Sequence, residues 1–364
     1  MGKITTAAVL YEPGTPYSLE EVELDDPKAG EVLVRIEACG ICHTDATMQY
    51  IMPMPCVIGH EGVGVIEEIG PGVQDLKPGD RVILSWPACG KCLNCLSGQR
   101  YICEEQFGLL FAGSRPDGSR TIKLRGEWIG GAFFQQSSFA NHAIASVSTV
   151  VKVDEDLPAE LLAALPCGVM TGAGSILNTM AMGPQDDLLV FGAGAVGLAA
   201  VMAAKLAGVY PIIVVDIKPE RLDLALELGA THVINAAQDD VITKVRGILP
   251  LGIRFAFDAS GAPAPWPIVA NLFRYGGVFG VAGVPSGMTL GERPSEMFSK
   301  AVRVQFIMGG HSIPQVFIPR MIEWYKQGRF PVDRLVMTFP FSQINEAFEA
   351  SHEGKAIKPV LLMS

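Results

Sequence analysis

The sequence predicts an α/β protein with two parts, a β-rich barrel and a doubly wound parallel sheet. Short strands broken by proline and glycine dominate the N-terminal part, which is typical of a small barrel. From about residue 160, strands alternate with helices, which is typical of a parallel sheet covered on both faces. The chain has 364 residues, enough for two domains that each bury a core.

Composition and charge exclude several classes of protein. Hydrophobic residues make up 49% of the chain, as in a globular protein and unlike a disordered one. The net charge of −10 argues against nucleic acid and against an anionic membrane surface, because both need a basic patch. No secretory signal is visible at the start, and glycines interrupt the apolar runs before about 20 residues. We therefore expect a cytoplasmic protein that does not cross a membrane.

The N-terminal part is predicted to contain several short strands. Residues 31–37 alternate apolar and polar side chains with the period of two that a half-buried strand requires. Residues 62–67 form the next predicted strand, and residues 81–84 follow after a Lys-Pro-Gly-Asp turn. Residues 104–130 are polar and glycine-rich, so we expect a loop there.

The stretch from Gly40 to Gly64 carries candidate metal ligands. Cys42 offers a thiolate and His60 an imidazole, which are the ligands that zinc prefers. They are too far apart in the chain for a zinc-finger knuckle, so tertiary folding must bring them together. A third ligand must come from elsewhere, and spacing alone does not identify it. Three protein ligands would leave one position of a catalytic zinc open for substrate.

Four further cysteines form a second candidate metal site. They lie close together in a CxxCxxC pattern with a fourth cysteine shortly after, at Cys89, Cys92, Cys95 and Cys103. Four thiolates make a closed tetrahedral zinc site that stabilises the fold and leaves no room for substrate. One alternative is a surface loop of free or disulfide-bonded cysteines. Another is a zinc ribbon that binds nucleic acid, which the acidic balance of the chain argues against.

A dinucleotide-binding βαβ unit is predicted between residues 188 and 216. A buried strand at 188–191 leads into a turn containing Gly192, Gly194, Val196 and Gly197, followed by a helix at 198–207. The glycines allow a tight turn and close approach of a pyrophosphate to the helix N-terminus. A second strand at 212–215 ends in an acidic residue, Asp216.

The acid at the end of the second strand selects the cofactor. The carboxylate of Asp216 would bind a ribose 2′-hydroxyl and repel a 2′-phosphate, which favours NAD over NADP. Lys218 and Arg221 follow and are candidates for contact with the adenosine. A solvated surface position is an equally good interpretation of Lys218.

The remaining elements complete the predicted fold. Strands at 255–258, 277–281 and around 304–307 extend the unit to a six-stranded parallel sheet. The C-terminal segment is predicted to contain a helix at 316–327, a second helix at 341–350 and a final strand at 359–363.

Taken together and in this order, the motifs resemble those of the zinc-dependent medium-chain alcohol dehydrogenases over essentially the whole chain. The motifs are CHTD (42–45), GHEGVG (59–64), the four-cysteine cluster, PCGVMTGAG (166–174), FGAGAVG (191–197) with its acid, and KPVL (358–361). The resemblance implies a discontinuous GroES-like catalytic domain, residues 1–168 and 308–364. A Rossmann domain that binds NAD, residues 169–307, would be inserted between them.

The resemblance also implies roles for single residues. Cys42, His60 and Cys167 match the ligands of the catalytic zinc, and Glu61 matches a residue just behind the metal. Asp45 would orient His60 by accepting its second ring N–H. Thr44 matches a hydroxyl that passes the alcohol proton to the nicotinamide ribose. The further cofactor residues implied are His43 and Lys358 near the pyrophosphate, Val196 beside the nicotinamide, and Thr171.

One position departs from the family pattern. Several members have a histidine three residues after the relay hydroxyl, where it ends the proton path at solvent. This chain has Thr47 there, which does not titrate near neutral pH. Water or another group would have to complete the path.

The substrate implied by the resemblance is a hydrophobic primary alcohol. Trp86, Phe133 and Phe134 fall near the substrate channel, and bulky apolar walls select an aromatic or allylic alcohol such as benzyl, cinnamyl or a terpenoid alcohol. The expected reaction is reversible oxidation to the aldehyde with hydride transfer to NAD, with two zinc ions per chain, in an aryl-alcohol dehydrogenase-like enzyme. A homodimer or homotetramer is implied.

Three alternative functions are open at this point. The first is oxidation of short-chain aliphatic alcohols, which differs only in the substrate. The second is a non-catalytic, zinc-stabilised dinucleotide-binding protein, which would leave one of the two metal sites unexplained. The third is a zinc-free, NADPH-dependent reductase, which would lack Cys42, His60 and the four-cysteine cluster.

Overall fold

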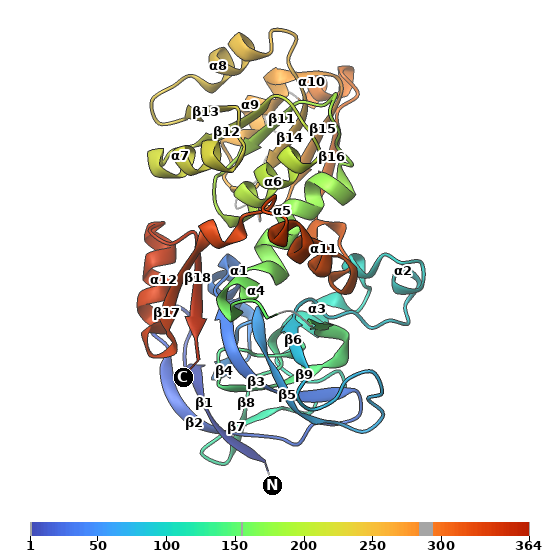
Figure 1. The fold of residues 1–364 in the computed structure, drawn as a ribbon, viewed down its shortest axis with the longest axis vertical. Helices are drawn as coiled ribbons and strands as arrows, with labels where there is room; N and C mark the ends of the chain where they lie inside the picture. The colour runs from blue at the N-terminus through green and yellow to red at the C-terminus, as the bar shows by residue number, and fades with distance from the viewer. Residues whose placement is uncertain (1, 154–155, 284–293, 364) are drawn as a thin grey trace. The chain divides into compact units, whose positions relative to one another are not determined.

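The computed structural model describes residues 2–153, 156–283 and 294–363. The chain divides into two compact units (Figure 1). Unit 1 comprises Met1–Cys167, Ile313–Met321 and Val332–Ser364, and unit 2 comprises Gly168–Ser312 and Ile322–Pro331. Residues 168, 308–312 and 322–331 therefore group with unit 2, whereas the sequence-based boundaries placed them in the catalytic domain. Within the described ranges, no helix has both the length and the apolar character needed to cross a bilayer.

Unit 1 is built on two β-sheets, in agreement with the predicted barrel-like part. The larger sheet has the order β10-β6-β5-β3-β18-β17, and β9 also pairs with β3. Its strands are β3 (Glu31–Gly40), β5 (Gly62–Ile69), β6 (Arg81–Leu84), β9 (His142–Ser146), β10 (Val150–Lys152), β17 (Val336–Pro340) and β18 (Lys358–Leu362). The smaller sheet has the order β4-β1-β2-β7-β8, with β1 (Lys3–Leu10), β2 (Ser18–Leu24), β4 (Cys56–Val57), β7 (Ile122–Leu124) and β8 (Glu127–Ile129).

The prediction that residues 104–130 form a loop is wrong in part. It contains α3 (Gln106–Phe111) and a hairpin of β7 (Ile122–Leu124) and β8 (Glu127–Ile129), which pairs with β2. The side chains of Ile122, Leu124 and Ile129 are buried in a cluster shared with β1 and β2. Strands of three residues are too short to give a periodic signal, so the polar turns around them dominated the pattern.

The C-terminal strand pairs with the chain just before and at the start of the stretch that carries the candidate metal ligands, Gly40 to Gly64. β18 pairs antiparallel with β3, with Leu361 opposite Cys39 and Val360 opposite Gly40. Ile41 N–H also donates to the carbonyl of Pro359 at 2.9 Å. This register places Lys358, the first residue of β18, beside the chain segment that carries Cys42.

The other helices of unit 1 are α1 (His43–Met48), α2 (Leu93–Leu96), α4 (Ala159–Ala163) and α12 (Ile344–Glu353). Helix α11 (Pro314–Lys326) is divided between the two units.

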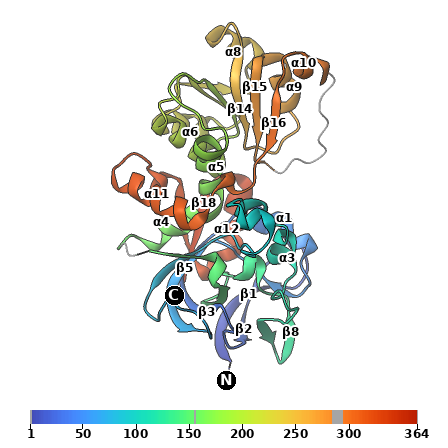
Figure 2. The ribbon, with the colours of Figure 1, turned by 90° about the vertical axis from the view of Figure 1, so that its right-hand side faces the viewer.

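Unit 2 contains the predicted six-stranded parallel sheet. The strand order is β13-β12-β11-β14-β15-β16, and every neighbouring pair is parallel. The strands are β11 (Leu188–Phe191), β12 (Ile212–Asp216), β13 (His232–Asn235), β14 (Ile253–Asp258), β15 (Phe273–Val281) and β16 (Arg303–Phe306). The helices are α5 (Met170–Gly174), α6 (Ala195–Leu206), α7 (Pro219–Leu228), α8 (Val241–Ile248), α9 (Pro265–Leu272) and α10 (Pro294–Ser299). Figure 2 shows α6 on one face of the sheet and α9 on the other.

The order of the strands identifies a candidate ligand-binding position. It runs outward from β11 in one direction through β12 and β13, and in the other through β14 to β16. The direction of winding therefore reverses between β11 and β14. In open parallel sheets ligands bind outside the carboxyl ends of the strands at such a switch point, which is where the glycine-rich turn after β11 lies.

Candidate metal and cofactor sites

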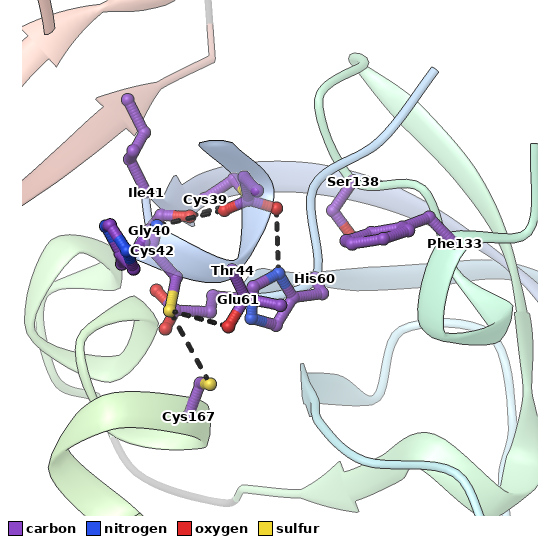
Figure 3. A network of polar contacts seen from close by, with 12 residues as sticks. Cys39, Gly40, Ile41, Cys42, Thr44, His60, Glu61, Phe133, Ser138 and Cys167 are labelled. Atoms are coloured by element: carbon purple, nitrogen blue, oxygen red, sulfur yellow. Dashed lines mark hydrogen bonds and ion pairs between the residues drawn. The ribbon is translucent and has the colours of Figure 1, made fainter. Parts of the chain in front are cut away.

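Four potential ligands gather in unit 1. One donor atom from each of Cys42, His60, Glu61 and Cys167 lies within 4.8 Å of the others. The two sulfur atoms, Cys42 Sγ and Cys167 Sγ, are 3.8 Å apart. In Figure 3 the side chains of Cys42, His60 and Cys167 converge on one point. The structure thus brings together the three residues that the resemblance implied as ligands, and their zinc-binding role is our proposal.

Separate elements position these side chains. Cys42 follows β3 and caps the N-terminus of α1, while His60 lies in the loop between β4 and β5. Cys167 lies in a π-helical turn, Leu165–Val169, after α4. The loop before His60 needs a glycine, because Gly59 has φ +94° and a Cβ there would lie 2.6 Å from the ring of Phe139.

Asp45 fixes the orientation of His60. Asp45 Oδ1 lies 2.8 Å from His60 Nδ1, and Asp45 Oδ2 accepts a hydrogen bond from the Cys42 backbone N–H at 2.9 Å. Both side chains are fully buried. An Nδ1–H donated to the carboxylate leaves Nε2 as the lone-pair atom, and Nε2 is buried without any hydrogen-bond partner. A buried imidazole nitrogen with no protein partner beside two thiols fits a zinc ion as its missing partner.

The electrostatics of the cluster favour a bound cation. A hydrogen bond from the Cys167 thiol lowers the pKa of Cys42 well below its usual range, and His60 assists while burial opposes the shift. Burial acts against a charged His60, yet the Asp45 carboxylate raises the pKa of that imidazole to about 10. A metal ion bound at Nε2 would take the place of the proton, so metal binding would release a proton from His60.

Glu61 and Lys358 form a buried ion pair next to the ligands. Lys358 is only 2% exposed; its ammonium pairs with Glu61 Oε2 and donates to the Ile41 carbonyl at 3.2 Å. Burial raises the pKa of Glu61 to about 7, against the opposing effect of Lys358. Burial also disfavours the Lys358 ammonium, but Glu61 and Cys42 raise its pKa above the usual value. The contact of Lys358 with the cofactor pyrophosphate stays a prediction, since here its ammonium faces Glu61.

The hydroxyl of Thr44, which the resemblance implies as a proton relay, lies next to the candidate metal ligands. Thr44 Oγ1 is 3.6 Å from Cys42 Sγ. Thr47 turns back onto its own helix, where its hydroxyl contacts the carbonyls of His43 at 3.1 Å and Thr44 at 3.4 Å. The side chain of His43 is exposed. Thr47 therefore does not extend the path from Thr44 outward.

Aromatic side chains wall the same cluster. Phe134 stacks on the ring of His60, with centroids 4.3 Å apart, and Phe133 meets it edge-on at 5.6 Å. Trp86 packs edge-on against Phe134 at 5.4 Å. Phe111, which no motif of the sequence marks, contacts both phenylalanines at 5.9 and 5.7 Å. We call Trp86, Phe111, Phe133 and Phe134 the aromatic wall.

The four-cysteine cluster forms a second metal-ligand set in unit 1. The donor sulfurs of Cys89, Cys92, Cys95 and Cys103 lie within 4.8 Å of one another. Backbone N–H groups point at the sulfurs, with Cys89 N 3.4 Å from Cys103 Sγ and Cys92 N 3.3 Å from Cys89 Sγ. Backbone donors from Glu104 and Cys95 lower the pKa of Cys92 to about 6. Four thiols gathered around one point, with backbone donors to stabilise their negative charge, fit a closed zinc site.

The glycine-rich turn in unit 2 has the geometry of a pyrophosphate site. Gly192 adopts φ +91°, and a Cβ on Gly197 would overlap the Gly192 carbonyl, so both positions need glycine. Gly194 caps α6 and faces open space, with no heavy atom within 4 Å of the place of a Cβ. A phosphate can therefore approach the backbone there.

Asp216 stabilises this turn as well as ending β12. Its Oδ2 accepts from Ala193 N–H at 2.7 Å, and its Oδ1 accepts from the N–H groups of Ile217 at 2.7 Å and Lys218 at 2.9 Å. The side chain is half-buried, so the carboxylate keeps lone pairs for a ribose hydroxyl. Arg221 Nε is buried without a hydrogen-bond partner.

Helix α5 packs closely on the first turn of α6. A Cβ on Gly172 would overlap the carbonyl of Val196. Thr171, its neighbour, is buried, and its carbonyl accepts from Ser175 Oγ at 2.7 Å. Contacts of Thr171, Val196, His43, Lys218 and Arg221 with NAD stay predictions.

Several known proteins are similar to this chain over most or all of its length. The family described as alcohol dehydrogenase GroES-like domain matches residues 28–155, and the family described as zinc-binding dehydrogenase matches residues 195–327. Geraniol dehydrogenase of Castellaniella defragrans is 40% identical over 98% of this chain and 97% of its own length. Two solved structures each align with this chain over 100% of its length and over 100% of their own length. One is an alcohol dehydrogenase zinc-binding domain protein from Burkholderia ambifaria (TM-score 0.97, 41% identity), and the other is benzyl alcohol dehydrogenase from Acinetobacter calcoaceticus (TM-score 0.95, 38% identity).

Proposed function

The chain belongs to the zinc-dependent alcohol dehydrogenase family, and on that premise we propose that it oxidises a hydrophobic primary alcohol, aromatic or allylic. The alcohol becomes the aldehyde, its hydride passes to NAD, and one proton is released. The reverse reaction uses the same groups. We further propose a cytoplasmic homodimer or homotetramer; six of the eight cysteines lie in the two candidate zinc sites, which need reduced thiols and so support a reducing compartment.

The observation that carries the substrate proposal is the aromatic wall beside the metal ligands. Phe133 and Phe134 are buried and contact the ring of His60 directly, and Trp86 packs against Phe134. Flat aromatic faces favour a planar, apolar substrate over a polyol or an ionic one. Two relatives support the same class, because their names specify geraniol, an allylic alcohol, and benzyl alcohol, an aromatic one.

The residues proposed to hold the catalytic zinc are Cys42, His60 and Cys167, and the four-cysteine cluster would hold a structural zinc. Zinc at the first site supplies a Lewis acid that lowers the pKa of an alcohol hydroxyl toward neutrality. NAD supplies the hydride acceptor, for which the glycine-rich turn and Asp216 are the proposed binding groups.

The chain's own side chains then have distinct tasks. Asp45 holds His60 in the tautomer that offers Nε2. We infer that the hydroxyl of Thr44, which lies 3.6 Å from Cys42 Sγ, accepts the alcohol proton and passes it on. The aromatic wall excludes water from the cluster, which strengthens every polar interaction there. Lys358 neutralises Glu61, so the pair adds no net charge beside the two thiols.

The test is an NAD-linked activity screen over benzyl alcohol, geraniol and ethanol, with zinc removed and then restored. We expect kcat/KM for benzyl alcohol and geraniol to exceed that for ethanol, and activity to return with zinc. Equal or better turnover of ethanol would assign the chain to short-chain aliphatic alcohols instead. Activity that survives complete zinc removal would reject the proposed chemistry.

A further inference from the structure

Residues 132–138 form a buried segment in unit 1 whose backbone is held in an unusual conformation. Four of its residues are not glycine and yet have positive φ angles, namely Ala132 (50°), Phe134 (53°), Gln135 (54°) and Ser137 (59°). Every residue of the segment is buried. Left-handed conformations at such residues persist only where the surrounding contacts fix them, and they cluster at functional sites.

Gln136 makes the contacts that connect this segment to the metal ligands. Its Nε2 donates to the His60 carbonyl at 3.0 Å and to the Ser85 carbonyl at 3.1 Å. Its Oε1 accepts from Ser138 Oγ at 2.6 Å and from Gly62 N–H at 3.3 Å. Both donors and both acceptor positions of the amide are thus used, at a residue only 2% exposed. A fully satisfied buried amide holds its partners in one arrangement.

The partners of Gln136 carry the site. The His60 carbonyl belongs to the proposed metal ligand, and Ser85 directly precedes Trp86 in the chain. Phe133 and Phe134 lie in the same segment as Gln136, and Phe134 stacks on the ring of His60. The amide of Gln136 therefore fixes three groups relative to one another: the loop that carries His60, the residue before Trp86, and the segment that carries Phe133 and Phe134.

We propose that Gln136 is a positioning residue that sets the place of the aromatic wall relative to the ligand His60 and thereby the preference for planar alcohols. The inference takes the identity of the substrate from the proposed function. The positioning of His60 and the aromatic wall by Gln136 is independent of the proposed function, because the contacts of Gln136 are the same whichever alcohol is oxidised. Gln136 reaches no reacting atom, so its effect passes through His60 and the aromatic wall.

The neighbouring Gln135 offers a matched control. It is also buried, at 5% exposure, and also lies in the strained segment. Its Nε2 donates to the carbonyls of Leu109 and Ser114, both at 3.1 Å, and not to the ligand loop. Q135M and Q136M thus remove hydrogen bonds of the same kind from adjacent buried amides, while methionine preserves the side-chain length.

The experiment measures two properties of the full-length chain carrying Q136M or Q135M. The first is the visible absorption spectrum with cobalt(II) at the catalytic metal site, which reports the ligand geometry. The second is the ratio of kcat/KM for benzyl alcohol to that for ethanol in the zinc enzyme. We expect Q136M to shift the cobalt bands and to lower the ratio about tenfold, mainly through the KM for benzyl alcohol. Q135M should lower the melting temperature similarly but keep the parent spectrum, and it should change the ratio much less than Q136M does, because its bond to Leu109 anchors α3 and thereby only Phe111 of the aromatic wall.

The outcomes separate the inference from the proposed function. If Q136M retains the parent spectrum and ratio, or if Q135M changes them equally, Gln136 is only a structural residue and the inference is overturned. If Q136M does not fold, S138A replaces it, because it removes only the 2.6 Å hydrogen bond that orients the amide; an unchanged spectrum and ratio then overturn the inference. If the parent enzyme itself does not prefer benzyl alcohol, the proposed function fails, and the cobalt spectra alone decide the role of Gln136.

Discussion

Asp45 and His60 illustrate how single residues build the proposed metal site. The carboxylate is fully buried, yet both of its oxygens have partners, because one accepts from His60 Nδ1 and the other from the Cys42 backbone N–H. One acid thereby orients two ligands at once. A buried carboxylate without such partners would be strongly unfavourable, so the ligand geometry and the burial of Asp45 depend on each other.

We predict that D45N lowers kcat/KM by about 10- to 100-fold, because an amide oxygen accepts the His60 Nδ1–H less strongly than a carboxylate and so holds the ring less firmly. Zinc should also leave the variant faster when a chelator is added. Steady-state kinetics and the rate of zinc release measure the two effects. D75N, which changes an exposed carboxylate of the same unit, serves as the control. Parent-like kinetics and zinc release in D45N would show that Asp45 does not position the ligand.

Among single residues, those in a recognisable motif were predicted correctly to lie together in the candidate site. Cys42, His60, Cys167 and the four cysteines all come together as their motifs implied. Gln136 and Phe111 could not be predicted as site residues from the sequence, for different physical reasons. Phe111 lies in a short helix that polar, glycine-rich flanks conceal. Gln136 is a buried polar residue, and its burial depends on hydrogen bonds to distant loops that spacing does not show. The available signal was a run of four polar residues, 135–138, between aromatic residues and without glycine or proline.

At the scale of elements, the segment from Cys89 to Cys103, which we call the four-cysteine lobe, is held by very little apolar packing. Its buried cluster consists of Ala88, Cys95 and Cys103, with Cys89, Cys92 and Leu109 packed against it. Leu93 and Leu96 of α2 point outward, with 74% and 73% of their surface exposed. A segment with so small a core depends on its metal for stability.

We predict that C95S loses the structural zinc and unfolds the lobe locally, because three thiolates hold zinc far more weakly than four and the lobe has almost no other core. Zinc content should fall from about two to about one per chain. Limited proteolysis should then cut near residues 89–105, whereas the parent resists. C56S is the control, since Cys56 is a buried cysteine of β4 that belongs to neither ligand set. A C95S variant that keeps both zinc ions and resists proteolysis would contradict this role for the lobe.

The glycine-rich turn of unit 2 supports a paired prediction. G194A adds a methyl group into open space, so the variant should fold as the parent does but bind NADH about tenfold more weakly, a loss of about 1.4 kcal/mol. G197A places a methyl group against the Gly192 carbonyl and should destabilise the fold by about 1–3 kcal/mol. Fluorescence titration with NADH and thermal unfolding distinguish the two effects. Tight NADH binding by G194A would place the pyrophosphate elsewhere.

Elements with strong periodicity were predictable, and short ones were not. The predicted strand at 188–191 has the same bounds as β11, because four apolar residues lead directly into a glycine turn. The six-stranded sheet followed from the alternation of such strands with helices. The hairpin of β7 and β8 was missed because each strand has three residues, and tertiary pairing with β2 decides its conformation.

At the scale of the whole molecule, each unit buries its own core and carries one part of the proposed reaction. Unit 1 contains both metal-ligand sets, and unit 2 contains the dinucleotide turn. The resemblance spanned the whole chain, which is why the family and the fold class could be predicted together. The choice of alcohol could not be predicted with the same precision. In our proposal it depends on how a few aromatic rings pack around His60, and this packing arises only from the folded chain.

The central claim is that one zinc ion is held jointly by Cys42, His60 and Cys167. Anomalous diffraction at the zinc edge from crystals of the purified protein tests it most directly. We predict two anomalous peaks per chain, one within the four-cysteine cluster and one in contact with Cys42 Sγ, His60 Nε2 and Cys167 Sγ. A single peak, confined to the four-cysteine cluster in fully zinc-loaded protein, would contradict the claim.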